Sequence, residues 1–133
     1  MVSRLLPGFA VVGAIGFLVD AGILTTLMAG FDMHHYAARA ISFPAAVTTT
    51  WYLNRRWVFD RRAVRMSGRE YMSYVLVQVI GAMINLLVFV AVIELVASLK
   101  ALPVIPLALG AGVALLFNFG ASRRFVFADY ERT

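Results

Sequence analysis

The sequence predicts an all-α integral membrane protein with four transmembrane helices, arranged as two parallel two-helix repeats. Hydrophobic residues make up 62% of the chain and charged residues only 14%, whereas a soluble domain has about a quarter of its residues charged. Four apolar stretches are each long enough to cross a bilayer core, which needs about 20 residues per helix. In addition, nearly the same six-residue string occurs twice, as NRRWVF at 54–59 and SRRFVF at 122–127.

The four expected spans cover residues 6–30, 36–54, 72–98 and 103–122. Together they fill the chain, so we expect one membrane domain over residues 1–133 and no soluble domain. The first apolar stretch is longer than the core of a signal peptide, which indicates a retained helix. The second and third spans are joined by a strongly basic linker, and the other two connections are short.

The distribution of basic residues predicts the orientation of the spans. Arginines gather on one side of the expected bilayer, whereas only Arg39 and Lys100 lie near the other. Cytoplasmic loops carry such an excess, so we expect a multi-pass protein of the cytoplasmic (inner) membrane with both termini cytoplasmic. The net charge of +5 then reflects topology and does not indicate a nucleic-acid partner. The cytoplasmic set is Arg4, Arg55, Arg56, Arg61, Arg62, Arg65, Arg69, Arg123, Arg124 and Arg132.

Two offsets relate the halves of the chain to each other. A shift of 65 residues places FAVVGAIGFLVD (9–20) on YVLVQVIGAMIN (74–85), and a shift of 68 places TWYLNRRWVF (50–59) on NFGASRRFVF (118–127). We therefore predict one repeat at about 5–60 and a second at about 70–128. Each repeat has an even number of spans, so both insert the same way round, about an axis along the membrane normal. Carriers are often built from such repeats, but duplication of a purely structural hairpin would give the same pattern.

A carboxylate and two amides lie inside the expected spans. Asp20 is near the middle of the first span, where a charge is costly unless it is paired or faces a polar cavity. The second repeat carries Gln78 and Asn85 on the face that corresponds to the one with Gly16 and Asp20. Two interpretations stay open: a polar site at mid-membrane, or a structural hydrogen bond between Asp20 and Asn85.

The basic linker joins the second and third spans on one side of the expected bilayer. Arg39 and Glu94 lie near the other ends of these two spans. We expect them at similar depth, where an ion pair would lower the cost of both charges. Alternatively, Arg39 receives an anionic group and Glu94 positions it.

The repeated strings place doubled arginines at the cytoplasmic ends of two helices. A guanidinium matches phosphate oxygens in a bidentate way, so these clusters suit the phosphate of a lipid. Ordinary topology anchors would also need basic residues here, but they would not need the repeated order. The candidate phosphate-binding residues are Arg55, Arg56, Arg123, Arg124, Asn54 and Asn118.

Residues for catalysis or metal binding do not stand out. The chain has no cysteine, and the adjacent His34 and His35 make a poor metal site without further ligands. There is no nucleophile–base arrangement and no glycine-rich phosphate loop. We therefore expect no enzyme activity, no metal and no cofactor.

Three motifs in this chain resemble the GtrA-like family of small four-helix membrane proteins. They are FAVVGAIGFLVD at 9–20, NRRWVF at 54–59 and NFGASRRFVF at 118–127. The resemblance covers nearly the whole chain and carries the family's characteristic positions onto a set of polar and aromatic residues. Ser122 departs from the pattern, because the family more usually has asparagine there. The set is Asp20, Asn54, Arg55, Trp57, Asn118 and Arg124.

The resemblance implies a polyprenyl-phosphate carrier lipid as the ligand. Family members are associated with cell-surface polysaccharide synthesis, and a related four-helix region forms the membrane part of some polyprenyl-phosphate sugar synthases. The expected function is translocation of a polyprenyl-phosphate-linked monosaccharide from the cytoplasmic to the outer leaflet. The doubled arginines would capture the phosphate, Asp20 and Asn85 would hydrogen-bond sugar hydroxyls, and Arg39 would contact phosphate on the far side. A homo-oligomer would line the path of the polar head group with more helices than the four of one chain.

Two alternatives differ from this prediction. The chain could be a non-transporting membrane partner of a polyprenyl-phosphate glycosyltransferase. It could also be a small multidrug exporter, since those are short four-span proteins with one membrane carboxylate. The arginines argue against an exporter, because a cationic drug gains nothing from them.

Overall fold

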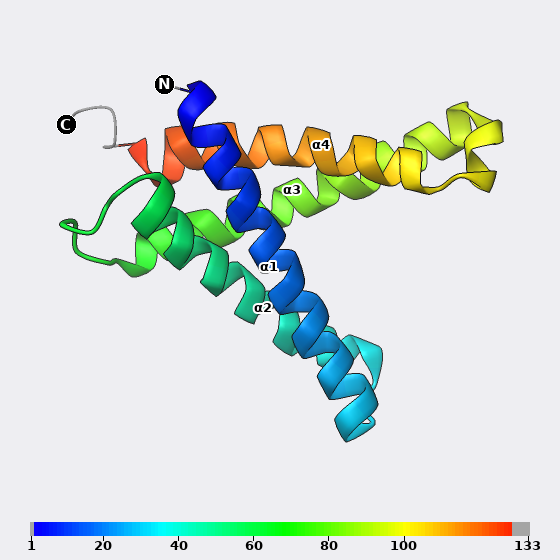
Figure 1. Cartoon of the computed structure of the whole chain (residues 1–133), viewed down its shortest axis with the longest axis horizontal. Helices are drawn as coiled ribbons and strands as arrows, with labels where there is room; N and C mark the ends of the chain where they lie inside the picture. The colour runs from blue at the N-terminus through cyan, green and yellow to red at the C-terminus, as the bar shows by residue number, and fades with distance from the viewer. Residues whose placement is uncertain (1, 129–133) are drawn as a thin grey trace. The chain divides into compact units, whose positions relative to one another are not determined.

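The computed structural model describes residues 2–128, and these residues fold into four long helices with three short helical turns (Figure 1). Each predicted span overlaps one of the long helices, and no strand occurs in the described part of the chain. The all-α class is therefore confirmed. The elements are α1 (Val2–Phe31), α2 (His35–Leu53), the π-helical turn η1 (Asn54–Val58), α3 (Gly68–Leu95), the 3₁₀ turn η2 (Ala97–Ala101), α4 (Val104–Ala121) and the π-helical turn η3 (Ser122–Val126).

Three helices have the length and composition to cross a membrane. They cover Ser3–Phe31, Gly68–Leu95 and Val104–Val126. Many of their large apolar side chains are exposed, such as Phe17 and Leu87. Apolar side chains that no other helix covers suit a lipid environment rather than water.

The fourth long helix, α2, is more polar than the other three and does not meet the same criterion. It contains Arg39 and three consecutive threonines at 48–50. The threonine hydroxyls donate to backbone carbonyls of the preceding turn, at 2.8, 2.8 and 3.0 Å. Hydroxyls satisfied within their own helix are compatible with a membrane, so α2 as a span stays a prediction.

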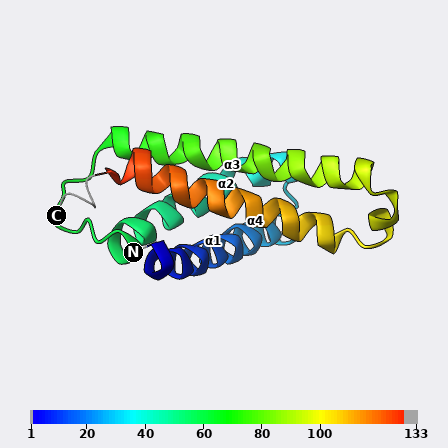
Figure 2. The same cartoon turned by 90° about the horizontal axis from the view of Figure 1, so that it is seen from above.

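The first hairpin, residues 2–67, pairs α1 with α2 along their lengths (Figures 1 and 2). Gly16 of α1 is buried against Thr50 of α2, so a side chain at Gly16 would collide with the threonine methyl group. The rings of Phe9 and Phe59 meet edge to face at 6.4 Å. Small residues at the contact let the two backbones approach closely, which stabilises helix pairs where lipid provides no hydrophobic force.

The second hairpin, residues 68–128, pairs α3 with α4 in the same manner. Gly81 of α3 lies against the amide of Asn118, and Gly110 of α4 lies against Asn85. The rings of Tyr74 and Phe127 are 6.2 Å apart.

Equivalent contacts recur in the two hairpins at the offsets that the sequence indicated. Gly16–Thr50 corresponds to Gly81–Asn118, and Phe9–Phe59 corresponds to Tyr74–Phe127. Such matched contacts are expected if each hairpin is one copy of a duplicated unit. The repeat itself stays a prediction.

Candidate functional site

The first repeated string, NRRWVF, forms the π-helical end of α2. The N–H of Phe59 donates to the carbonyl of Asn54 at 2.9 Å, one residue farther back than in an α-helix. Asn54 and Arg55 turn inward with Val58 and Phe59, whereas Arg56 and Trp57 are exposed.

The second string, SRRFVF, ends α4 with the same geometry. The N–H of Phe127 donates to the carbonyl of Ser122 at 2.8 Å. Ser122 and Phe127 are buried, Arg124 and Phe125 are exposed, and the guanidinium of Arg124 lies 5.9 Å from the Phe125 ring centre. The two strings are therefore matching helix ends, each with its second arginine and its aromatic residue directed outward.

Arg55, the inward arginine of the first string, holds the basic linker against the helix end. Its Nη1 donates to the carbonyl oxygen of Arg61 and its Nη2 to that of Val64. The N–H of Arg61 in turn donates to the carbonyl of Arg55 at 2.8 Å. Only 4% of Arg55 is exposed, so this side chain acts first as a clamp on residues 61–64.

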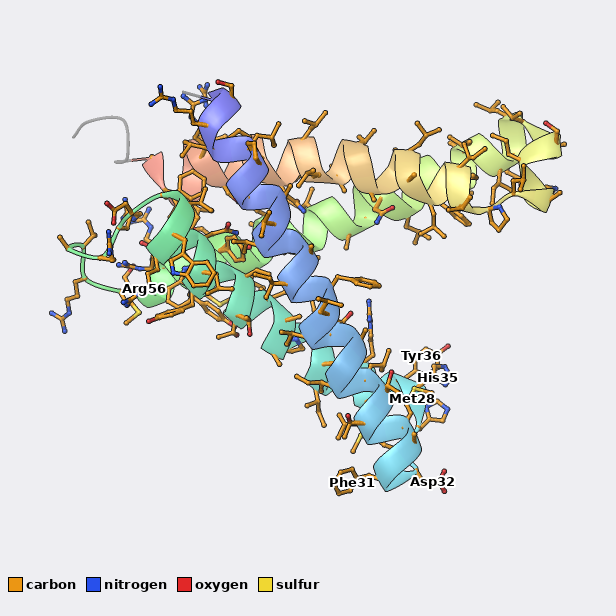
Figure 3. The ribbon with its side chains drawn as sticks, in the orientation of Figure 1. Met28, Phe31, Asp32, His35, Tyr36 and Arg56 are labelled. Carbon is orange, nitrogen blue, oxygen red and sulfur yellow. The ribbon has the colours of Figure 1, made fainter. Side chains whose placement is uncertain are left out.

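The clamped linker and the end of α2 enclose a pocket of about 330 Å³, which we call the arginine pocket. Arg56, which lies at the end of α2 (Figure 3), donates from Nη1 to the hydroxyl of Tyr52 at 3.2 Å. Four guanidinium groups in one pocket create a strongly positive local potential that suits a phosphate. The lining residues are Tyr52, Arg55, Arg56, Arg62, Val64, Arg65 and Met66.

An exposed ion pair lies at the entrance to the linker. Arg62 Nε donates to Asp60 Oδ1 at 2.7 Å, and Asp60 adopts a left-handed backbone with φ of 42°. The hydrogen bond from Arg62, followed by its charge, lowers the pKa of Asp60. Because only Nε of Arg62 contacts the carboxylate of Asp60, the Nη groups of Arg62 are not required for this ion pair.

We expect the carboxyl of Asp60 to titrate below the ordinary aspartate value of about 3.9. A lowered folded-state pKa stabilises the fold above the unfolded-state pKa, and this contribution is lost as pH falls through the lowered value. The pair is therefore intact at neutral pH. Carboxyl NMR titration tests this expectation, with Arg62→Gln as the control that should restore the ordinary midpoint. An ordinary midpoint in the unchanged protein would contradict the pairing.

A second ion pair joins α1 to α2 inside the first hairpin. Arg39 Nη1 donates to Asp20 Oδ2 at 2.5 Å. This corrects the expectation that Arg39 pairs with Glu94. Asp20 and Arg39 are on neighbouring helices of one hairpin, whereas Glu94 is an exposed residue near the end of α3 in the other.

A family model matches most of the chain. The family model described as GtrA/DPMS, transmembrane domain, matches residues 8–127. The chain belongs to this family. A search of curated proteins found no match to the chain.

Membership of the GtrA/DPMS family confirms the resemblance drawn from the three motifs and makes the chain a multi-pass membrane protein. It supports a role in processes that use polyprenyl-phosphate-linked sugars, in a family whose members are generally non-catalytic. The matched range includes both π-helical strings and the three glycine-based helix contacts at Gly16, Gly81 and Gly110.

Several predicted site residues of this GtrA/DPMS chain have structural contacts instead of exposed positions. Asn54 is 1% exposed and does not line the arginine pocket. Asn118, in the last turn of α4, contacts Gly81 and donates to Gln78 at 3.5 Å within the α3–α4 interface. Asn85 lies against Gly110 in the same interface. The structure places these three asparagines in buried or interfacial positions, and their roles in binding phosphate or sugar stay predictions.

The prediction from sequence missed part of the arginine pocket. The sequence assigns Arg62 and Arg65 only to topology, yet both line the pocket with Tyr52, Val64 and Met66. One signal was available: Tyr52 precedes Arg56 by four residues, the spacing at which helical side chains meet. Nothing in the sequence marks the fold-back of residues 61–64.

Proposed function

We propose that this protein captures the phosphate of a polyprenyl-phosphate-linked monosaccharide in the arginine pocket and carries the polar head group across the membrane. The observation that supports the proposal most directly is the pocket itself, with four arginines around about 330 Å³ at the end of a helix. The polyprenyl tail would stay in lipid, so only the head group needs a polar path.

The chemistry of the pocket favours a lipid phosphate over a simple anion. Arg56 and Arg65 can donate paired N–H groups to phosphate oxygens, while Val64 and Met66 offer apolar contact to the first isoprene unit. Trp57, with 62% of its surface exposed, follows directly on Arg56. Tryptophan prefers the membrane–water interface, and a pocket beside it would be at the depth of lipid phosphates.

The first hairpin also carries the charged pair expected along a path for the head group. Asp20 and Arg39 are hydrogen-bonding groups between α1 and α2. Ionisable residues inside membrane spans commonly mark substrate pathways. Direct contact of Asp20 or Arg39 with the substrate is therefore part of the proposal.

The exposed linker supports one second candidate function. Arg62 and Arg65 are both exposed and could bind an acidic surface of a glycosyltransferase. In that case the protein would anchor the enzyme without transporting lipid. The two functions differ in whether the isolated protein recognises polyprenyl phosphate.

We expect Arg56→Ala/Arg65→Ala to weaken polyprenyl-phosphate binding by at least about tenfold, because two charge-assisted contacts are lost. The measurement is native mass spectrometry of the purified protein with a short-chain polyprenyl phosphate and, in parallel, with phosphatidylglycerol. The double variant Arg4→Ala/Arg69→Ala removes the same charge from exposed positions outside the pocket and should bind normally.

Arg124→Ala provides a second control: Arg124 occupies the position in its string that Arg56 occupies in the first, but it does not line the arginine pocket, so the phosphate contact predicted for it from the sequence is not part of this proposal. Equal losses in all variants, or equal binding of both lipids, would contradict the pocket and favour the anchor function. If selective binding is found, transport is tested with polyprenyl-phosphate-linked sugar in proteoliposomes, where the pocket variant should be slow and both controls normal.

A further inference from the structure

The ion pair between Asp20 and Arg39 has fewer hydrogen bonds and is more exposed than we expect of a purely structural ion pair. One guanidinium nitrogen contacts one carboxylate oxygen, at 2.5 Å, instead of two parallel bonds. The Arg39 side chain is 53% exposed, although Asp20 is only 16% exposed. A buried charge pair is favourable when both partners are fully hydrogen-bonded, and this pair is not.

Two polar atoms near the pair are buried without hydrogen-bond partners among residues 2–128. One is Oδ1 of Asp20, the carboxylate oxygen that Arg39 does not contact. The other is the hydroxyl of Ser42, which lies three residues after Arg39 on α2 and is fully buried. Buried polar atoms are nearly always hydrogen-bonded, so these two oxygens leave unused hydrogen-bonding capacity next to the exposed guanidinium of Arg39.

The position of Arg39 along α2 is also informative. It precedes Arg55 by sixteen residues, which corresponds to about 24 Å of helix. The hydrocarbon core of a bilayer is about 30 Å thick. If α2 and η1 together form the predicted span, that span carries an arginine toward each end: Arg55 in the lining of the arginine pocket and Arg39 beside Asp20.

We propose that Arg39 is a second anion site and that Asp20 is its exchangeable counter-ion. A phosphate group reaches Arg39 by displacing the carboxylate of Asp20, and the returning carboxylate releases the phosphate. Because Asp20 uses a single oxygen, the exchange breaks one hydrogen bond. The displaced carboxylate is left as an unpaired negative charge, which favours its return to Arg39 and the release of the phosphate. This inference rests on the proposed function, since it assumes that a phosphate-bearing head group travels along the first hairpin.

The exchange predicts opposite effects for two substitutions at one ion pair. Asp20→Asn removes the competitor, so Arg39 should bind phosphate more tightly, by about tenfold or more. Release should slow by a similar factor, and transport should slow with it. Arg39→Gln should abolish the second site, whereas Arg39→Lys, which keeps the charge, should retain it.

The test measures the number of bound lipids per chain by native mass spectrometry, with a short-chain polyprenyl phosphate as the probe and inorganic phosphate in a parallel titration. The Asp20→Asn variant should bind a second molecule of polyprenyl phosphate, and Asp20→Asn/Arg39→Gln should lose it. Competition by inorganic phosphate would assign the recognition to the phosphate alone. Absence of competition would show that the lipid portion also contributes.

The same series in the Arg56→Ala/Arg65→Ala background separates this inference from the proposed function. If the arginine pocket does not bind lipid, Asp20→Asn should still create one site that depends on Arg39. If Asp20→Asn adds no lipid in either background, or if the added lipid survives Arg39→Gln, the exchange is wrong. The double variant Asp20→Asn/Arg39→Gln is neutral like the native pair, so its unfolding midpoint shows whether a lost site reflects lost structure.

Discussion

Replacing Gly110 by alanine is expected to force α4 away from α3 and to lower the stability of the second hairpin by about 1–3 kcal/mol or more. A methyl group at this position would meet both the side chain of Asn85 and its backbone, with the carbonyl oxygen only 2.7 Å away. The side chain of Asn85 could rotate, but its carbonyl belongs to α3 and moves only with the helix. Overpacking of this kind is costly because helix backbones yield little.

Gly112, two residues further along α4, provides the matched control. No atom lies within 4 Å of a methyl group placed there, so Gly112→Ala should be neutral or stabilising by up to about 1 kcal/mol through helix propensity. Gly81→Ala should be intermediate, because the new methyl would meet only side-chain atoms of Asn118, which can move. The measurement is reversible unfolding in mixed micelles. Equal effects of Gly110→Ala and Gly112→Ala would contradict the α3–α4 contact.

The sequence contains enough information to predict the helices and the function class. Uninterrupted apolar stretches set the number of long helices, and α2 from His35 to Leu53 lies within a residue of the predicted span 36–54. Each repeated string also forms the end of a long helix, as the sequence predicts. These features depend on residues that are close in sequence, so local patterns are enough to reveal them.

The direction of individual side chains could not be predicted in the same way. Arg55 and Arg56 are adjacent and chemically identical, yet one clamps the linker and the other is exposed. A π-helical turn decides which is which, because its wider hydrogen-bond spacing changes the register of the last turn. No residue type in NRRWVF indicates that spacing.

The sequence pattern also could not predict which side chains of neighbouring helices contact each other. Arg39 has two candidate carboxylates at plausible depth, and the rotation of α2 against α1 selects Asp20. Asn118 ends an apolar run, but its depth in the helix contact places it on Gly81 and Gln78 and not at the surface. Both outcomes depend on how two helices are rotated about their axes, and the steric fit of small residues determines that rotation.

Arg55→Ala is expected to disable the arginine pocket even though Arg56, Arg62 and Arg65 remain. The two Nη bonds to the carbonyl oxygens of Arg61 and Val64 would be lost. Hydrogen bonds to charged groups contribute about 1.5–3 kcal/mol each, so the linker should separate from the helix end. We expect a loss of stability of about 3 kcal/mol and a loss of phosphate binding at least as large as that of Arg56→Ala/Arg65→Ala.

Amide hydrogen exchange distinguishes this clamp from a direct ligand. The N–H groups of Arg61 and Val64 donate within the clamped linker, at 2.8 and 3.1 Å, so their exchange should accelerate in Arg55→Ala and stay slow in Arg56→Ala. Arg55→Lys keeps the charge but lacks the planar fork that reaches two carbonyls, and it should therefore resemble alanine in exchange. If exchange stays slow while binding is lost, Arg55 acts as a phosphate ligand and not as a clamp. If Arg55→Lys binds normally, charge alone is sufficient, and the fold-back of the linker does not build the pocket.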